Sequence, residues 1–189
     1  TVKGGVLTDL GGQDTENGLL LEAHTDTLGG MVCRIKDNGR LQLTKIGGMR
    51  AENGETENLR VYTREGKIYD GTLQLCNASV HVNGSYGDAK RDFDTTEVVL
   101  DEDVKSAGDV RGLGIEVGDF VCFDPRTRRT NSGYLKSRFL DDKLSVGILL
   151  GFAKYLADNK ITLPRKTYVH VTVYEEVGHG GAASVPAGV

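Results

Sequence analysis

Two adjacent glutamates, Glu175 and Glu176, stand where the strand-like stretch TYVHVTVY runs into a glycine-rich segment. Buried carboxylates are costly unless they are paired, hydrogen-bonded or bound to metal, so the end of a core strand is an unusual place for two of them. Adjacent strand residues face opposite sides, so both can enter one pocket only if the chain turns there. Gly178, Gly180 and Gly181 allow that turn. The alternative is an exposed strand edge with both carboxylates in water.

Two further stretches carry residue types suited to metal binding. In AHTDTLGG, His24 and Asp26 are two residues apart, so on a strand both side chains point to one face. This spacing suits a metal-binding imidazole whose ring is oriented by a carboxylate, with a surface hydrogen bond as the simpler alternative. In FLDDKLS, Asp141 and Asp142 open a helix, where they would either cap it or bridge two cations. Imidazole and carboxylates together suit zinc, cobalt or manganese.

The remaining histidines and the cysteines are weaker candidates. His170, flanked by valines, is predicted to be a packed strand residue, and His81 lies far from the carboxylates along the chain. His179, between two glycines, is a candidate for a substitute ligand. The three cysteines fit neither a disulfide framework nor a CxxC metal site, and we predict reduced, mostly buried thiols. These cysteines are Cys33, Cys76 and Cys122.

The elements that must position these residues differ in their hydrophobic pattern along the chain. Residues 18–24, GLLLEAH, form an apolar run that ends in polar residues, as a buried parallel strand does at a functional edge. Residues 31–127 contain short alternating segments, among them SVHVNG, with the hairpin signals DNG and REGK and one predicted helix around residues 106–113. Helical spacing then predicts a helix through residues 145–160, followed by the strand TYVHVTVY.

This order of elements predicts an α/β fold: a mostly parallel sheet with flanking helices, interrupted by an inserted small β-barrel-like domain. Residues 1–30 and 128–189 are predicted to form the α/β domain, which is incomplete in this chain. Residues 31–127 are predicted to form the insertion. Because the polar motifs follow strand ends or open a helix, we expect them to meet at the carboxyl edge of the sheet.

Charge and hydropathy limit the classes of partner. The 189-residue chain has a formal net charge of -4, and an acidic surface attracts neither nucleic acid nor an anionic membrane. No apolar run approaches the roughly 18 residues of a membrane span, and the first residues contain no signal-peptide core. We therefore expect a cytoplasmic protein whose partners include no nucleic acid and no membrane.

In order and spacing, AHTDTLGGMV, KSRFLDDKLSVGILL and YEEVGHGGAAS resemble the three motifs of the dinuclear-metal aminopeptidases, which include glutamyl, deblocking and tetrahedral aminopeptidases. The segment between the first two motifs resembles that family's inserted dimerisation domain. Three motifs in order, over nearly the whole chain, are more specific than any one of them. The resemblance implies a metallopeptidase that hydrolyses the N-terminal peptide bond of peptides and forms a homo-oligomer through the inserted domain.

The resemblance also implies roles for the residues of the first two motifs. His24 would bind one of two divalent metal ions, with zinc or cobalt ahead of manganese, and Asp26 would orient the imidazole. Asp141 would bridge the two ions. Asp142, joined to Asp141 by a cis peptide bond, would contact the metal ligands without binding a metal itself.

The same resemblance separates the two glutamates. Glu175 would be the general base that takes a proton from a metal-activated water, and Glu176 would bind a metal. Two ions about 3.5–4 Å apart lower the pKa of a bridging water and polarise the scissile carbonyl, which leaves a carboxylate to move the proton. Members of the family carry a further Asp and His after this motif and a longer stretch before the first. The resemblance therefore implies a chain truncated at both ends that alone binds metal weakly.

Three other functions stay open. A catalytically incompetent assembly or scaffold subunit of the same fold would keep the insertion and have vestigial carboxylates. GHGG is similar to the oxyanion loop of some esterases, but no G-x-S-x-G elbow accompanies it. Paired carboxylates also serve glycosidases, although adjacent glutamates rarely face each other across a sugar at about 5–9 Å.

Overall fold

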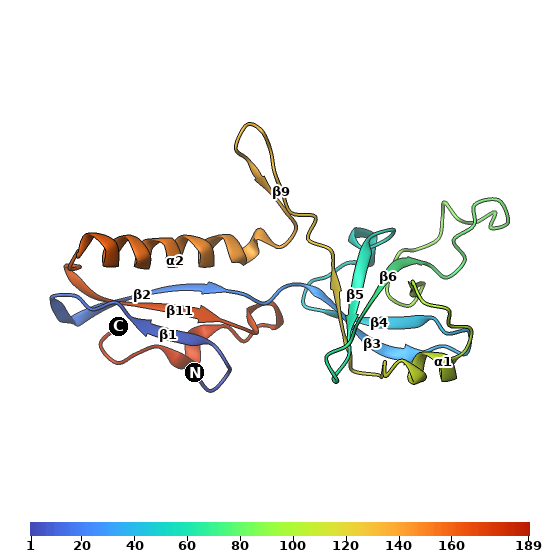
Figure 1. Ribbon diagram of the computed structural model, residues 1–189, viewed down its shortest axis with the longest axis horizontal. Helices are drawn as coiled ribbons and strands as arrows, with labels where there is room; N and C mark the ends of the chain where they lie inside the picture. The colour runs from blue at the N-terminus through green and yellow to red at the C-terminus, as the bar shows by residue number, and fades with distance from the viewer. The chain divides into compact units, whose positions relative to one another are not determined.

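The protein, described here as a computed structural model of residues 1–189, forms two compact units. One unit consists of Thr1–Thr27 and Arg126–Val189, and the other of Leu28–Pro125. Figure 1 traces both along the chain. The predicted α/β fold with a barrel-like domain is confirmed, since one unit is a sheet with a helix and the other is a closed β-barrel. The division of catalysis and assembly between the two units stays a prediction.

The discontinuous unit contains a three-stranded sheet in the order β1-β11-β2. β2 (Asp14–His24) and β11 (Arg165–Thr172) are parallel, and their register places Thr172 opposite His24. β1 (Val6–Asp9) pairs antiparallel with the other side of β11. The sequence did not predict β1, because its four residues lie among glycines and show no alternation of buried and exposed positions. The parallel pair brings the carboxyl ends of β2 and β11 to the same edge.

Helix α2 (Leu140–Asn159) runs along one face of this sheet and contacts β2 (Figure 1). The predicted helix is confirmed, but the predicted capping by an aspartate is wrong. The residue before the helix is Phe139, which makes no side-chain capping bond, and Asp141 and Asp142 have non-helical dihedral angles. The peptide bond between these two aspartates is cis, as the family resemblance implied.

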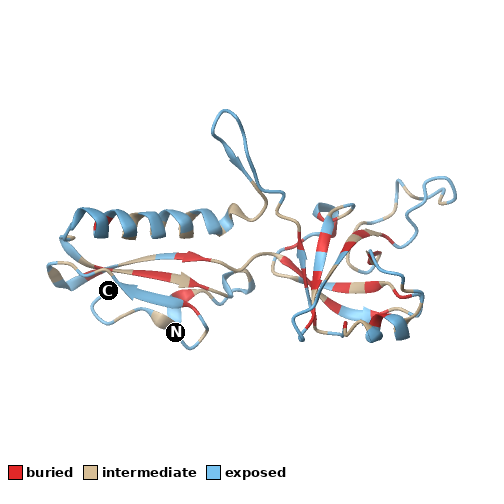
Figure 2. Ribbon diagram, viewed as in Figure 1, coloured by how far each residue is buried: buried red, intermediate tan, exposed pale blue.

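The helix buries little of its surface. Figure 2 colours most of α2 as exposed, and Leu156 is its one buried residue. Several of its apolar side chains lie in contact with solvent. These are Leu144, Ile148, Leu150 and Tyr155. The spacing of apolar residues thus predicted the helix correctly, while burial of its apolar side chains within this chain is slight.

The second unit is a closed barrel with strand order β3-β4-β7-β6-β5-β8. Its hairpins follow the predicted turn signals, with DNG between β3 and β4 and REGK between β5 and β6. The bounds are β3 (Gly29–Ile35), β4 (Leu41–Ile46), β5 (Asn58–Tyr62), β6 (Ile68–Leu75), β7 (Thr96–Leu100) and β8 (Phe120–Phe123). Figure 2 shows buried residues alternating along these strands, as expected when one face of each strand lines the interior.

Shorter elements complete the chain. Helix α1 (Ala107–Gly112) is capped by Ser106, whose hydroxyl accepts a hydrogen bond from the Asp109 amide, and confirms the predicted helix. Single 3₁₀ turns and a small hairpin make up the rest. They are η1 (Ala51–Asn53), β9 (Arg128–Arg129) paired with β10 (Leu135–Lys136), η2 (Glu175–Val177) and η3 (Gly181–Ser184).

Two predictions for the barrel unit are wrong. SVHVNG is a series of turns and not a strand, and its Val80 and Val82 are exposed. Its alternation therefore has no sheet to pack against. None of the three cysteines forms a disulfide, as predicted, but all are exposed and not buried. Cys122 lies between two buried residues of β8, so the period of two along the strand places its side chain outward. Cys33 lies on β3 where the register shifts between Val32 and Arg34.

No helix of the structure combines the length and the apolar composition that crossing a membrane requires.

Candidate active site

His24, the last residue of β2, is the point at which the three sequence motifs meet. Its imidazole is almost fully buried, and Nε2 lies 3.0 Å from Asp141 Oδ1 at the start of α2. The same Nε2 lies 3.6 Å from Glu175 Oε2 in the turn after β11. The parallel pairing of β2 and β11 explains this meeting, since functional groups of α/β sheets gather at the carboxyl ends of their strands.

Asp26 connects the imidazole to the glutamate turn. Its backbone carbonyl lies 3.1 Å from His24 Nδ1, and its Oδ1 lies 3.4 Å from the same nitrogen. Its Oδ2 accepts a hydrogen bond of 3.0 Å from the backbone N–H of Glu176. One short loop residue thus contacts the His24 ring and fixes the backbone of the second glutamate.

The two glutamates lie in a turn, as their position before several glycines predicted. β11 ends at Thr172, and Glu175 begins the 3₁₀ turn η2. Gly178 closes this turn in the left-handed region, with φ of 81°, and donates its N–H to the Glu175 carbonyl. The Glu175 side chain is 54 % exposed, so a carboxylate beside a buried imidazole remains open to solvent.

The surroundings shift the pKa of two site residues. Burial opposes protonation of His24, but its hydrogen bonds to the Asp141 carboxylate and the Asp26 carbonyl, with the nearby negative charges, outweigh burial and raise the pKa. Burial also raises the pKa of Glu176, and the negative charges of Asp141 and Glu175 add to that effect against the opposing influence of His24. Carboxylates thus outnumber the one imidazole in this cluster.

The other candidates stand apart from this cluster. Asp142 follows Asp141 directly across the cis bond, but neither a hydrogen bond nor an ion pair joins it to His24. His170 is buried in the middle of β11, as predicted for a packed strand residue. His179 is exposed and contributes only backbone hydrogen bonds, and His81 is exposed in the barrel unit.

One cation near the site was missed by the sequence reasoning. Lys143, directly after the two aspartates, donates from Nζ to the Thr25 carbonyl at 2.6 Å. It thereby ties the start of α2 to the loop between His24 and Asp26. A lysine beside two aspartates gave no signal of this role, because the contact spans 118 positions along the chain.

The donor types in the cluster fit a divalent cation, but no ready-made site is present. No group of three or more His, Cys, Asp or Glu side chains is arranged to hold a metal ion. In favour of a cation are the excess of carboxylates around His24 and Asp26 Oδ1, a buried oxygen without a hydrogen-bond partner. Unpaired buried carboxylate oxygens are costly, and a cation is one of the few partners that relieve several at once.

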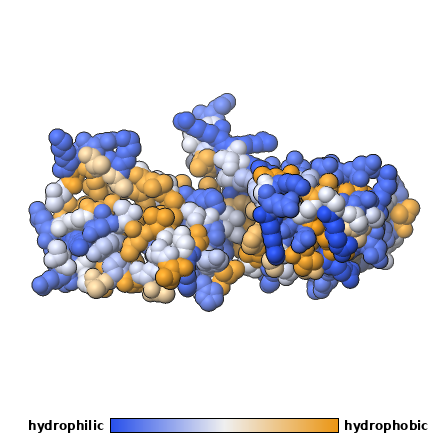
Figure 3. All heavy atoms as spheres, turned by 60° about the horizontal axis from the view of Figure 1, so that its bottom comes forward, coloured by the Kyte–Doolittle hydropathy of each residue, from blue (hydrophilic) through white to orange (hydrophobic).

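Apolar side chains border the glutamate turn on the surface. Tyr174 and Val177, on either side of the glutamates, are 53 % and 44 % exposed. Figure 3 shows apolar atoms at the surface of the unit that contains β1 and β11. Apolar surface therefore lies beside the polar side chains of the glutamate turn.

Known proteins resemble this chain over almost all of its length. YhfE of Bacillus subtilis, an aminopeptidase homologue, is 45% identical over 184 residues, which are 97% of this chain and 53% of that protein. The aminopeptidase APDkam598 of the archaeon Desulfurococcus kamchatkensis is 27% identical with a TM-score of 0.82, over 96% of this chain and 47% of the other. The TET1 peptidase of Pyrococcus horikoshii is 27% identical with a TM-score of 0.75, over 93% of this chain and 50% of the other.

The chain therefore spans about half the length of the relatives it matches. The family model described as M42 glutamyl aminopeptidase matches residues 4–189, which include the barrel unit and all three motifs. The convergence of those motifs on His24 gives this match a structural basis. The chain belongs to the M42 glutamyl aminopeptidase family.

Proposed function

We propose that the natural protein containing these residues is a metal-dependent aminopeptidase that hydrolyses the N-terminal peptide bond of peptides. The observation that supports this best is the convergence on one imidazole. His24 Nε2 lies within 3.0 Å of Asp141 and 3.6 Å of Glu175, although these residues come from three separate motifs. The three relatives described above carry the names of aminopeptidases and peptidases.

Glu175 is the proposed general base. A base must come within hydrogen-bond reach of the proton that it accepts while remaining open to substrate and water. The Glu175 carboxylate meets both conditions, since it lies beside His24 and is 54 % exposed. Its position on η2 is held at the backbone, because the N–H of the next residue is bonded to Asp26. Asp26 in this proposal orients His24 and holds the turn that carries the base.

Two divalent metal ions, zinc or cobalt ahead of manganese, are the proposed cofactors, held by His24, Asp141 and Glu176. When bound, such ions lower the pKa of water and polarise a carbonyl oxygen. His24 must be deprotonated at Nε2 to serve as a ligand, and Asp26 then fixes the tautomer through Nδ1. Asp142 is proposed to support the ligands from its place after Asp141.

The proposed partners are a peptide substrate and further copies of the same chain. The TET1 peptidase, by its description, assembles into a tetrahedron or a large octahedral shell, which supports a homo-oligomer. The unit Leu28–Pro125 is the proposed contact between copies. A cytoplasmic location also belongs to this proposal.

The test uses the full natural chain, loaded with zinc or cobalt, and a chromogenic amino-acid anilide with a free or an acetylated amino group. We expect hydrolysis of the free substrate only. Glu175→Gln should lower kcat by about 10²–10⁴-fold, the usual contribution of a general base, while metal content stays unchanged. Glu102→Gln, on an exposed residue of the barrel unit, is the matched control and should leave kcat unchanged.

Two results would contradict the proposal. Unchanged kcat in Glu175→Gln would remove Glu175 from the role of base. Neither metal uptake nor hydrolysis by the full natural chain would favour the scaffold function, in which the fold remains but the carboxylates are vestigial.

A further inference from the structure

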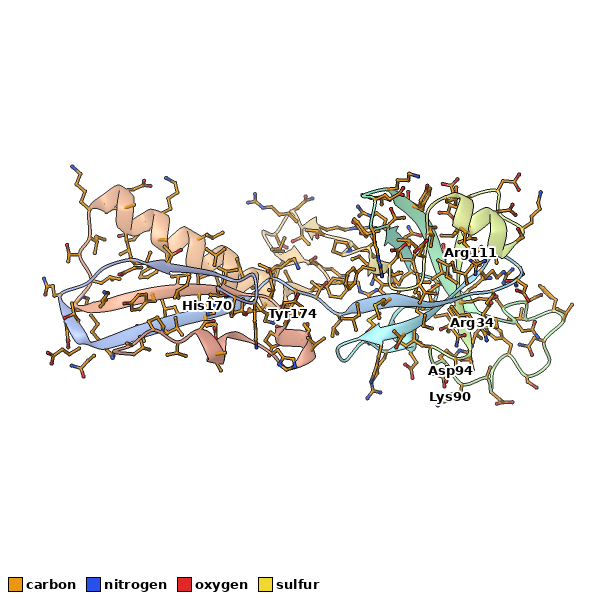
Figure 4. All side chains as sticks on the ribbon, turned by 90° about the horizontal axis from the view of Figure 1, so that it is seen from below. Arg34, Lys90, Asp94, Arg111, His170 and Tyr174 are labelled. Carbon is orange, nitrogen blue, oxygen red and sulfur yellow. The ribbon has the colours of Figure 1, made fainter.

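A second pair of polar residues, a buried histidine and a partly exposed glutamate, lies two residues further from the sheet edge than His24. His170 on β11 and Glu22 on β2 are direct neighbours in the parallel register. Because side chains two apart on a strand share a face, Glu22 lies on the same face as His24. His170 is 1 % exposed, and its Nδ1 lies 2.7 Å from Glu22 Oε1. Figure 4 marks His170 within β11, with Tyr174 beyond the end of the strand.

The proposed reaction leaves this pair without a role, yet burying the His170 ring is costly. Neither ring nitrogen of His170 makes a hydrogen bond of good geometry, although Nδ1 is within ion-pair distance of the Glu22 carboxylate, which is 37 % exposed. An apolar side chain in place of His170 would fill the same interior position at lower cost. The cost of the buried imidazole suggests that the pair has a specific task at this place in the unit.

The chain packs against both sides of the His170 ring through glycines. A Cβ atom on Gly5 would lie 3.0 Å from His170 Nε2, which is tighter than usual contact. A Cβ atom on Gly181 would lie 2.6 Å from His170 Nδ1 and would overlap Glu22 Oε1. Gly181 is buried and begins η3, immediately after the turn that carries the two glutamates. Only a residue without a side chain can approach the pair this closely.

The glutamate turn is therefore held at two ends. Before it, Thr172 of β11 lies opposite His24, and Asp26 binds the Glu176 amide. After it, Gly181 rests on the Glu22–His170 pair. The four residues from 177 to 180 lie between the Glu176 amide and Gly181, and a Cβ atom on Gly180 would lie 3.6 Å from Glu175 Cγ.

We infer that Glu22 and His170 are positioning residues that seat Gly181 and so fix the turn bearing Glu175 at the edge of the sheet. They do not touch substrate or cofactor. The expected effect on the reaction rests on the proposed function. The structural part, in which the pair holds Gly181 and the turn in place, does not depend on that function. Misplacement of a reacting group by about 1 Å costs on the order of 10²-fold in rate. Loss of the contact between the pair and Gly181 should therefore change kcat more than KM.

The first measurement is amide hydrogen exchange in the full natural chain, followed in peptides that cover residues 175–184. Glu22→Ala removes the support, and Gly181→Ala forces the turn off the pair. Each change should speed exchange in this segment by about tenfold or more, while β6 and β7 of the barrel unit stay as protected as in the wild type. Glu16→Gln, on an exposed residue of the same strand that does not pair with His170, is the control for a charge change and should have no effect.

The second measurement is a double-mutant cycle. In Glu22→Ala/Gly181→Ala, the new methyl group enters the space that the carboxylate vacates and keeps only the close contact with His170 Nδ1, so exchange should be slower than in Gly181→Ala alone. A general loss of stability would instead make the two effects add. Glu22→Gln keeps the side-chain volume and provides a milder variant if Glu22→Ala does not fold.

Kinetics separate this inference from the proposed function. If the wild type hydrolyses aminoacyl substrates, the single variants should lower kcat by about 10- to 100-fold and leave KM within about twofold. If the wild type has no activity, the proposed function fails, and exchange in residues 175–184 alone decides whether the pair seats the turn. Unchanged exchange there in both single variants, or equal acceleration throughout β2 and β11, would overturn the inference.

Discussion

Glu97 provides a prediction whose size follows from the structure. It is 3 % exposed on β7, and Lys36 Nζ donates to its carboxylate at 2.7 Å, while Arg40 Nη1 donates to the other oxygen. Lys36 and Arg40 flank the turn between β3 and β4. A single residue pair, Leu41 with Val98, defines the ladder between β4 and β7, so the two ion pairs reinforce the least paired seam of the barrel.

We expect Glu97→Gln to lower the free energy of unfolding of the barrel unit by about 2–3 kcal/mol at pH 7. Hydrogen bonds to charged groups contribute about 1.5–3 kcal/mol each, and removal of one partner of a buried ion pair costs about 3–5 kcal/mol. The lower part of this range applies because glutamine keeps the volume and one acceptor. The side chains of Lys36 and Arg40, at 16 % and 35 % exposure, can also turn to water.

The assay is urea unfolding read by amide exchange in peptides from β4 and β7, which follows the barrel separately from the other unit. With a denaturant slope of about 1–3 kcal/mol per M, the midpoint should fall by about 1–3 M. Glu65→Gln is the matched control, since Glu65 pairs with Lys67 at 3.3 Å on the surface of the same unit. Exposed ion pairs contribute little, so this midpoint should not move measurably.

The pH dependence gives a second check on the same variant. Burial works against ionisation of Glu97, but the hydrogen bonds from Lys36 and Arg40 outweigh it and lower its pKa from 4.5. The stabilisation is therefore complete above pH 4.5 and is lost as the pH falls through the lower pKa of the folded state. The difference between wild type and Glu97→Gln should shrink below pH 4.5. An unchanged midpoint at pH 7, or a difference that grows on acidification, would refute this account of the seam.

Two further predictions concern the site and the core. Asp141→Ala in the full natural chain should lower the metal content well below that of the wild type, because the proposed bridging ligand serves both ions; equal content by elemental analysis would contradict that role. Leu73→Ala, at a fully buried position of β6, should cost about 2–5 kcal/mol in urea unfolding, whereas Ile68→Ala on the same strand, at 52 % exposure, should cost much less.

The sequence predicted elements whose signals are local. DNG and REGK specify hairpins because their residues suit tight turns, and both hairpins formed in the predicted places. The strand TYVHVTVY and the helix through residues 145–160 likewise follow from side-chain type and spacing. The carboxylates and His24 were predicted to meet because parallel strands end at a common edge, and the structure places Asp141 and Glu175 beside that imidazole.

The features that were not predicted depend on contacts between distant residues. Lys36 and Glu97 are 61 positions apart, and nothing in either local sequence points to the other. SVHVNG alternates like a strand, but no neighbouring strand is available to pair with it. His170 was correctly expected to be packed, whereas its partner Glu22 and its contact with Gly181 follow only from the sheet register. Local pattern gives elements, and the register decides which polar groups meet.

The closure of the barrel has a consequence for the order of folding. β2 ends at His24 and β11 leads into the glutamate turn, and the two strands pair residues as far apart along the chain as Asp14 and Arg165. Within the barrel, Gly30 of β3 pairs with Val121 of β8. The first and last residues of this unit, Leu28 and Pro125, therefore adjoin two neighbouring strands. A barrel that folds first shortens the effective loop between β2 and β11 about threefold, which lowers the entropic cost of closure by about 1 kcal/mol. Slow or incomplete barrel folding would then delay assembly of the candidate active site, without any change in the site residues themselves.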